Sequence, residues 1–290
     1  MIQRVKNNLK YIFSRFTLIS SMVFGTISIL QMFVDWKTFG IEETDLKYKI
    51  IVFCSLLFVC GISSIIWGVL LSNKITVFSE DEVEIIVKYD DLMNIAFPKK
   101  QKEERIVVIA VNCCFDTEIS QDLIREQTVH GQFLKRFASN EFERQCLDSA
   151  IETSLAEFGV LAVQLERSEK RYGKLKRYPL GSVARINGRN GVTFFLLALT
   201  EFDKDCKAHC NKHQYAECIL KLFEYYDSHG QGMNIYLYPM GTGMARTGLT
   251  KKDALKTVVT LTKISKEHLK SKTTIVVDKR NKNEIAITDI

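Results

Sequence analysis

The stretch that decides the fold lies near the C-terminus, where residues 236–249 read YLYPMGTGMARTGL. The apolar residues before Pro239 predict the end of a strand, and the Gly-Thr-Gly sequence at 241–243 predicts a tight turn, because glycine readily adopts positive φ. Successive amide N–H groups in such a turn form a nest for phosphate oxygens, to which Arg246 would add charge-assisted hydrogen bonds. The pattern indicates a phosphate-binding turn or, more plainly, a structural link between a strand and a helix.

Strands and helices alternate on both sides of this turn. The run RIVVIAV at 105–111 is typical of a strand buried on both faces. A capping box at Thr250–Asp253 opens the helix that follows the turn. Hydrophobic periodicity predicts strands at 75–78, 83–89, 105–111, 183–186, 192–199, 233–238, 273–277 and 284–287, and helices at 119–137, 141–158, 207–226 and 250–269. The class is therefore α/β with a mixed sheet.

Two apolar runs precede this domain. Residues 16–34 read FTLISSMVFGTISILQMFV and residues 50–71 read IIVFCSLLFVCGISSIIWGVLL, without a charge in either. A membrane-spanning helix needs roughly 20 mainly apolar residues. A signal peptide is the alternative for the first run, but no small-residue cleavage site follows it and a second run comes at once. The sequence predicts a transmembrane hairpin over residues 1–74 and a soluble domain over residues 75–290.

The flanking charges predict the topology of the hairpin. Arg4, Lys6, Lys10 and Arg15 precede the first run without any acidic residue, whereas the loop 35–49 mixes acids and lysines. Under the positive-inside rule, the N-terminus lies in the cytosol, and two spans return the chain there. We expect a multi-pass protein of the inner or plasma membrane with a cytosolic soluble domain.

Small residues mark one face of each predicted span. Gly25 and Gly61 lie among serines and threonines, and small faces let helices approach closely in lipid. They are compatible with packing of the hairpin within one chain or with assembly between chains.

The charge distribution and the cysteine spacing argue against several classes of protein. The net charge of +6 is spread along the chain without a dense Lys/Arg run, which argues against a nucleic-acid partner. The eight cysteines lack the spacing of a secreted disulfide scaffold and are interpreted as reduced thiols. Cys206, His209, Cys210 and His213 would share one face of the helix predicted at 207–226, but ligands spread over two turns cannot converge on one ion. We expect neither a metal nor a cofactor.

Several motifs resemble those of one family, in that family's order. The block at 236–249 resembles the phosphate loop of macro domains, an ADP-ribose-binding fold. VKYDDL at 87–92 resembles the first-strand block of macro domains, whose aspartate, matched here by Asp91, contacts the adenine amino group. VIAVN at 108–112 resembles the strand that leads into the first ligand loop. The resemblance implies a macro-domain-like mixed sheet flanked by helices.

Further segments resemble one branch of these proteins. They are NCCFDT at 112–117, VHGQF at 129–133, YPLGSV at 178–183 and LLALTEF at 196–202, which are similar to the macro domain of Thoeris anti-phage effectors. Two spans followed by this domain is the layout of type II Thoeris effectors. The resemblance implies binding of an ADP-ribose-derived signal, a histidine conjugate made from NAD by a TIR-domain partner, followed by homo-oligomerisation and membrane disruption.

The resemblance favours a binding protein over an enzyme. Catalytic macro domains carry a paired-Asn loop and a Gly-rich stretch, whereas Cys-Cys-Phe-Asp follows Asn112 here. The alternatives are a membrane-anchored hydrolase of ADP-ribose adducts and a tether for ADP-ribosylated proteins. We expect no catalytic residue and predict that the ligand contacts Asp91, Asn112, Phe115, Asp116, Thr117, His130, Gly131, Gln132, Gly241, Thr242, Gly243, Met244 and Arg246.

Overall fold

The chain folds as two compact units. The computed structural model describes residues 2–34, 36–40, 46–71, 73–100, 103–241 and 246–290. One unit comprises Met1–Ile75 with Arg280–Asp289, and the other comprises Thr76–Lys279 with Ile290. The segment 280–289, which the sequence analysis placed in the soluble domain, therefore packs with the N-terminal helices.

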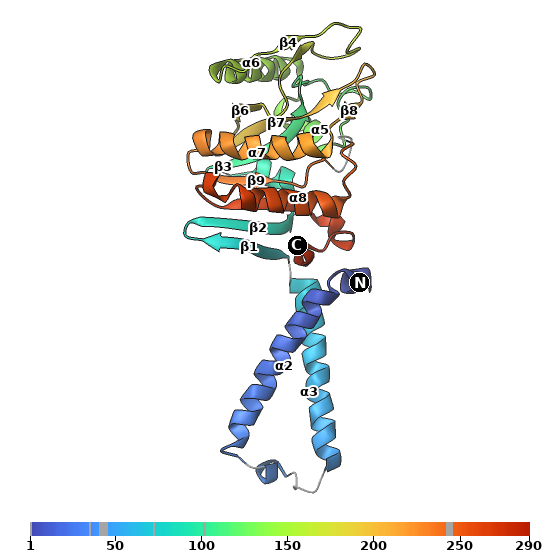
Figure 1. The fold of residues 1–290 in the computed structure, drawn as a ribbon, viewed down its shortest axis with the longest axis vertical. Helices are drawn as coiled ribbons and strands as arrows, with labels where there is room; N and C mark the ends of the chain where they lie inside the picture. The colour runs from blue at the N-terminus through green and yellow to red at the C-terminus, as the bar shows by residue number, and fades with distance from the viewer. Residues whose placement is uncertain (1, 35, 41–45, 72, 101–102, 242–245) are drawn as a thin grey trace. The chain divides into compact units, whose positions relative to one another are not determined.

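The N-terminal unit is built on two long apolar helices. Its elements are α1 (Ile2–Asn7), α2 (Leu9–Gln31), η1 (Trp36–Phe39), α3 (Leu46–Ile66) and η2 (Trp67–Leu71). Helices α2 and α3 pack on each other, with the rings of Phe24 and Phe53 5.1 Å apart, and Figure 1 shows them converging at one end. Both are long and apolar enough to cross a membrane, and most of their side chains are exposed. They are candidate membrane spans.

The C-terminal segment differs from the prediction. No strand forms at 284–287; the described chain there runs through η4 (Lys279–Asn283) and η5 (Ile287–Asp289). The preceding strand, β10 (Thr273–Asp278), already pairs on both sides, so it offers no free edge to a following strand. The side chains of Ile285 and Ile287 are buried instead.

The second unit contains a mixed sheet. Its strand order is β1 (Lys74–Glu80), β2 (Val83–Asp90), β10, β9 (Asn234–Leu237), β3 (Arg105–Asn112), β7 (Val192–Phe202) and β6 (Val183–Asn187), and β8 (Ala208–His209) pairs with β7. β2, β10, β9, β3 and β7 are parallel, and β6 is antiparallel to β7. The carboxyl ends of the five parallel strands therefore meet at one edge of the sheet.

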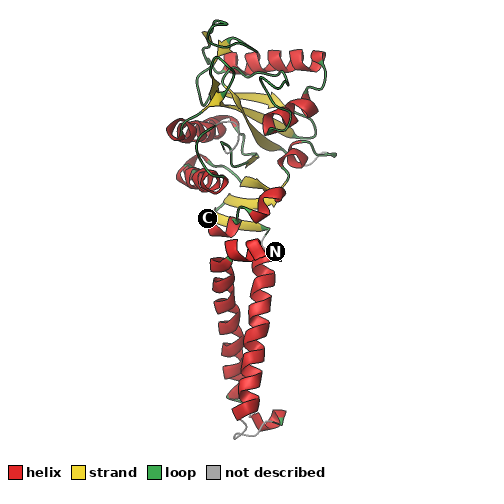
Figure 2. Ribbon diagram, turned by 90° about the vertical axis from the view of Figure 1, so that its right-hand side faces the viewer, coloured by secondary structure: helices red, strands yellow, loops and turns green. Residues whose placement is uncertain are grey.

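Helices cover both faces of the sheet, as Figure 2 shows. Alternate side chains of β3 point to opposite faces. Val107, Ile109 and Val111 share a core cluster with α4 (Leu92–Ala96), α5 (Val129–Phe137) and α6 (Glu141–Glu157). On the other face lie α7 (Lys212–His229) and α8 (Lys251–Ile264), which run side by side in Figure 1. The remaining elements are β4 (Val163–Gln164) and β5 (Lys176–Arg177), which pair with each other, and η3 (Lys266–His268).

Two predicted helices begin later than the periodicity indicated. The helix predicted from residue 119 begins at Val129, because Thr128 caps its N-terminus and the chain before it is irregular. The helix predicted from residue 207 begins at Lys212, capped by Asn211 in a capping box. Cys206, His209 and Cys210 therefore do not lie on the helix. In the described part of the chain, no group of three His, Cys, Asp or Glu side chains is placed to hold a metal ion.

Candidate functional site

A cavity of 490 Å³ opens at the carboxyl ends of β3, β7 and β9. In open α/β sheets ligands bind outside this edge, because loops diverge there and leave a crevice. Most of the lining is apolar, with a few polar groups, as is usual for small-molecule sites. The lining residues are Ala110, Val111, Asn112, Leu123, Ile124, Arg125, Gln127, Thr128, Val129, His130, Leu199, Thr200, Phe202, Ala208, Tyr238, Pro239 and Gly241.

Asn112 contributes an unpartnered donor to this cavity. The β3–β7 register shifts at Asn112, a bulge-like irregularity of the kind that re-aims a side chain. Its Oδ1 accepts a hydrogen bond of 2.9 Å from the Cys114 amide, whereas its Nδ2 has no partner among the described residues. The side chain is only 3% exposed. A buried amide donor without a partner is unfavourable, so this NH₂ group is suited to a ligand acceptor.

The first turn of α5 forms a second wall. Thr128 Oγ1 accepts from the Gly131 amide at 3.0 Å and donates to the Arg125 carbonyl at 2.7 Å, which fixes the helix start against the preceding loop. His130 follows in the same turn and is buried. Burial, and secondarily the charge of Lys174, lowers the pKa of His130 to about 3. The imidazole is therefore neutral at physiological pH.

The third wall is the turn after β9. Gly241 has φ +84°, a conformation that side-chain-bearing residues rarely adopt. A Cβ at Gly241 would lie 2.9 Å from Thr247 Cγ2. Glycine at this position therefore lets Thr247 pack against the turn. Thr247 Oγ1 donates to the Gly241 carbonyl at 2.7 Å, which ties the two ends of the turn together.

Arg125 gives the cavity its charge. Among the lining residues that the structure describes, it is the only one with an ionised side chain at neutral pH, since His130 is neutral. Burial raises the pKa of the Tyr238 phenol well above its usual range, so that side chain is neutral too. The described lining therefore favours an anionic or neutral ligand over a cation.

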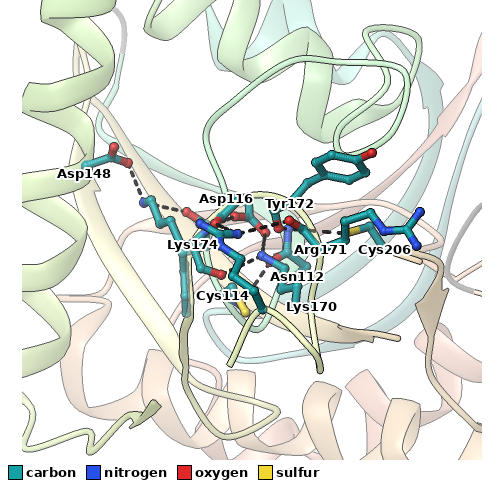
Figure 3. A network of polar contacts seen from close by, with 12 residues as sticks. Asn112, Cys114, Asp116, Asp148, Lys170, Arg171, Tyr172, Lys174 and Cys206 are labelled. Carbon is teal, nitrogen blue, oxygen red and sulfur yellow. Dashed lines mark hydrogen bonds and ion pairs between the residues drawn. The ribbon is translucent and has the colours of Figure 1, made fainter. Parts of the chain in front are cut away.

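Three predicted ligand residues, Phe115, Asp116 and Thr117, are not among the residues that line the cavity. Figure 3 shows Asp116 in a polar network with Lys170 and Lys174. Phe115 is buried and packs edge-on against Tyr178 with ring centroids 5.6 Å apart. Asp116 Oδ2 is 2.6 Å from Lys170 Nζ, with both side chains buried. Thr117 Oγ1 donates to an Asp148 carboxylate oxygen at 2.7 Å. Of the three, Asp116 holds the loop 165–175 against the end of β3 through Lys170 and Lys174.

Several of the other predicted ligand residues have structural roles next to the cavity or away from it. Asp91 caps α4, accepting from the Met93 amide at 2.8 Å, and does not line the cavity. Gln132 donates to the Gln127 carbonyl at 3.0 Å, which braces the cavity-lining loop from behind. A Cβ at Gly131 would lie 2.2 Å from the Arg125 carbonyl oxygen, so only glycine fits against that loop.

Of the remaining turn residues, Arg246 is exposed with φ +51°. The predicted contacts Thr242, Gly243 and Met244 lie outside the described residues.

The structure thus brings together Asn112, His130 and Gly241, from three segments far apart in the chain. Arg125, Thr128 and most of the apolar lining were not predicted from the sequence. Thr200 and Tyr238 were also missed, although they lie at the carboxyl ends of parallel strands, a signal that would have found them.

Comparison with known proteins relates this domain to a known family. A family model for the macro domain of Thoeris protein ThsA matches residues 85–278. Thoeris protein ThsA of Bacillus amyloliquefaciens (strain Y2) is 28% identical over 211 residues, which cover 70% of this chain and 64% of that protein. This chain therefore spans less than two thirds of the relative's length.

Solved macrodomain structures are more distant. The Oceanobacillus iheyensis macrodomain with ADP is 11% identical with a TM-score of 0.46, and covers 72% of this chain and 90% of its own. A mutant of the same macrodomain with ADPR is 9% identical with a TM-score of 0.47, and covers 72% of this chain and 92% of its own. Because the family model spans nearly all of the sheet and its helices, this chain belongs to the Thoeris ThsA macro-domain family.

Proposed function

We propose that this protein is a membrane-anchored effector of an anti-phage Thoeris system, and that its macro domain binds an ADP-ribose-derived signal. The observation that carries the proposal is the cavity at the carboxyl edge of the sheet, with the unpartnered Asn112 amide on one wall and the Gly241 turn on another. Family membership supports this choice of ligand, because macro domains are an ADP-ribose-binding fold.

The signal we propose is an ADP-ribose conjugate, specifically of histidine, made from NAD by a TIR-domain partner enzyme. The cavity volume of 490 Å³ is in the range of small-molecule sites. Arg125 supplies a positive charge for an anionic nucleotide, and the neutral His130 is able to donate or accept a hydrogen bond.

A binding role is favoured over hydrolysis. A general base works best with a pKa near the operating pH. The pKa of His130, about 3, makes its imidazole a weak base at neutral pH. Residues 115–117, which follow the Asn112 strand, are engaged in packing and in the Asp116–Lys170 network away from the cavity.

The membrane role rests on α2 and α3. Their exposed side chains include Phe13, Met22, Ile29, Phe58 and Val59. Contiguous apolar surface of this kind is unfavourable in water, whereas lipid accommodates it. We propose that ligand binding makes the macro domains assemble, that the tethered helices are thereby concentrated, and that the membrane is disrupted.

The first experiment measures binding. Full-length protein in nanodiscs is titrated with ADP-ribose and its histidine conjugate by calorimetry, alongside N112D and N140D. N112D keeps the acceptor for the Cys114 amide, removes the donor and adds a negative charge, so affinity should fall at least about tenfold. N140D makes the same change at the cap of α6, where Asn140 Oδ1 accepts from the Glu143 amide, and should leave affinity unchanged. Absence of binding by the wild-type protein would refute the proposal.

The second experiment follows the ligand and the assembly. Mass spectrometry after incubation should recover the conjugate intact, whereas turnover would support the hydrolase alternative. Mass photometry should show larger assemblies only when the ligand is present. The same size distribution with and without saturating ligand would rule out assembly as the switch.

A further inference from the structure

A second buried polar group adjoins the cavity without a partner. Tyr215 lies in the first turn of α7, its side chain is 0% exposed, and its hydroxyl makes no hydrogen bond within the part of the chain that the structure describes. Buried tyrosine hydroxyls ordinarily find a partner, because an unpaired one loses its bonds to water without replacement. Such an exception calls for a functional explanation.

The position of the ring connects it to the ligand site. Tyr215 Cε2 lies 3.1 Å from the point that a Cβ on Gly241 would occupy. Gly241 lines the cavity, whereas Tyr215 does not, so the phenol stands directly behind the turn. Thr247 Oγ1 donates to the Gly241 carbonyl at 2.7 Å from the same side. Of these two side chains behind the turn, Tyr215 is the one whose hydroxyl has no hydrogen-bond partner among the described residues.

The hydroxyl is available as a donor. Burial, with smaller contributions from Tyr238 and Cys210, raises the pKa of Tyr215 well above its usual range. The phenol therefore keeps its proton at any pH at which the protein functions.

We propose that Tyr215 is a positioning residue for the diphosphate of the ligand, its hydroxyl donating to the Gly241 carbonyl, which also accepts from Thr247, when phosphate oxygens lie against Gly241. This inference rests on the proposed function. The free protein carries an unsatisfied donor and the bound protein satisfies it, so a hydrogen bond is gained only on binding. The hydroxyl therefore has opposite effects on the stability of the free protein and on its affinity for diphosphates.

The test compares Y215F with Y226F in the full-length protein. Both tyrosines are fully buried on α7, but Tyr226 Oη donates to the Met233 carbonyl at 2.7 Å and also bonds Ser271 Oγ at 2.8 Å. Y215F should weaken binding of ADP-ribose and ADP about three- to tenfold and leave adenosine binding unchanged. It should also match or exceed the wild-type melting temperature without ligand. Y226F should lower that melting temperature and leave all affinities unchanged.

Two outcomes would overturn the inference. One is Y215F binding ADP-ribose as tightly as the wild type, and the other is an equal loss of affinity for adenosine, which would indicate a general packing defect. A wild-type protein that binds neither ADP-ribose nor ADP would instead overturn the proposed function, and this inference with it.

Discussion

At the scale of single residues, the acid–base behaviour of His130 is strongly altered by its surroundings. It lies in the first turn of α5, in the cavity wall, where burial lowers its pKa to about 3 from the ordinary value of 6.5. The folded protein therefore resists a proton that the unfolded chain accepts freely. That difference links the stability of the fold to pH.

The lowered pKa of His130 fixes the direction in which stability changes with pH. At pH 7 His130 is mostly neutral in both states and contributes little. As the pH falls below about 6.5 the unfolded chain binds a proton that the folded site excludes, so the free energy of unfolding should fall, by up to about 1.4 kcal/mol per pH unit, until about pH 3. Melting temperatures of the wild type and H130Q between pH 7 and pH 4 check this, with H130Q showing the flatter profile.

H213Q provides the matched control for this measurement. His213 is exposed on α7, so its replacement should leave the pH profile of the wild type unchanged. Parallel profiles for the wild type and H130Q would contradict the assignment of a buried, neutral His130.

At the scale of elements, the loop 165–175 depends on one buried ion pair. Lys170 Nζ bonds the Asp116 carboxylate at 2.6 Å and the Lys174 carbonyl at 2.7 Å, and the Lys174 amide bonds Asp116 Oδ1 at 2.6 Å. Both charged side chains are fully desolvated, so each depends on the other. This pair explains why Asp116, which was predicted to contact the ligand, does not line the cavity.

Breaking this pair should be costly. K170M leaves an uncompensated buried carboxylate and should reduce the free energy of unfolding by about 3–5 kcal/mol, whereas the double variant D116N/K170M should lose less than the sum of the two single variants. Chemical denaturation measures both. K176M, which removes the half-exposed Lys176–Glu152 pair, serves as the control and should change stability little.

Two results would contradict this interpretation of Asp116. Additive single and double variants would show that the pair is not coupled. A folded D116N protein that loses ligand affinity would place Asp116 at the ligand after all.

At the scale of the whole molecule, helix α1 contacts the segment 280–289 within the N-terminal unit. Arg4 Nε donates to Asn283 Oδ1 at 2.8 Å, and Asn7 Nδ2 donates to the Asn283 carbonyl at 2.8 Å. The segment 280–289 follows β10, a central strand of the sheet, by direct chain continuity. The unit that carries the candidate spans therefore includes the segment Arg280–Asp289.

This packing should depend on Asn283. N283A removes the side-chain acceptor for Arg4, so amide hydrogen exchange should become faster in 280–290 and in α1 while the sheet keeps its protection. S182A, which removes a hydroxyl bond of 2.7 Å to the Pro179 carbonyl in the other unit, is the control. Unchanged exchange in α1 and 280–290 would show that the contact contributes nothing to the packing of that segment.

Much of the fold was predictable from local pattern. The strand at 105–111 and the helix at 141–158 agree with β3 and α6 to within one residue at each end. The first is a continuous apolar run of strand length, and the second is capped by Asn140 directly before its predicted start. The starts of α5 and α7 were predicted wrongly, because apolar periodicity runs on through the preceding loops, whereas Thr128 and Asn211 cap the helices later. Side-chain capping decides a boundary more sharply than periodicity does.

The sequence by itself determined the two apolar runs, the α/β class and the residues that end the parallel strands, since each follows from short-range periodicity and composition. Only the tertiary structure decided which polar residues face the cavity. Asn112 and Asp116 lie four residues apart, yet one presents an unpartnered amide to the cavity and the other is paired with Lys170, far along the chain. Local pattern cannot distinguish them, because the partner that neutralises a buried charge is chosen by the fold.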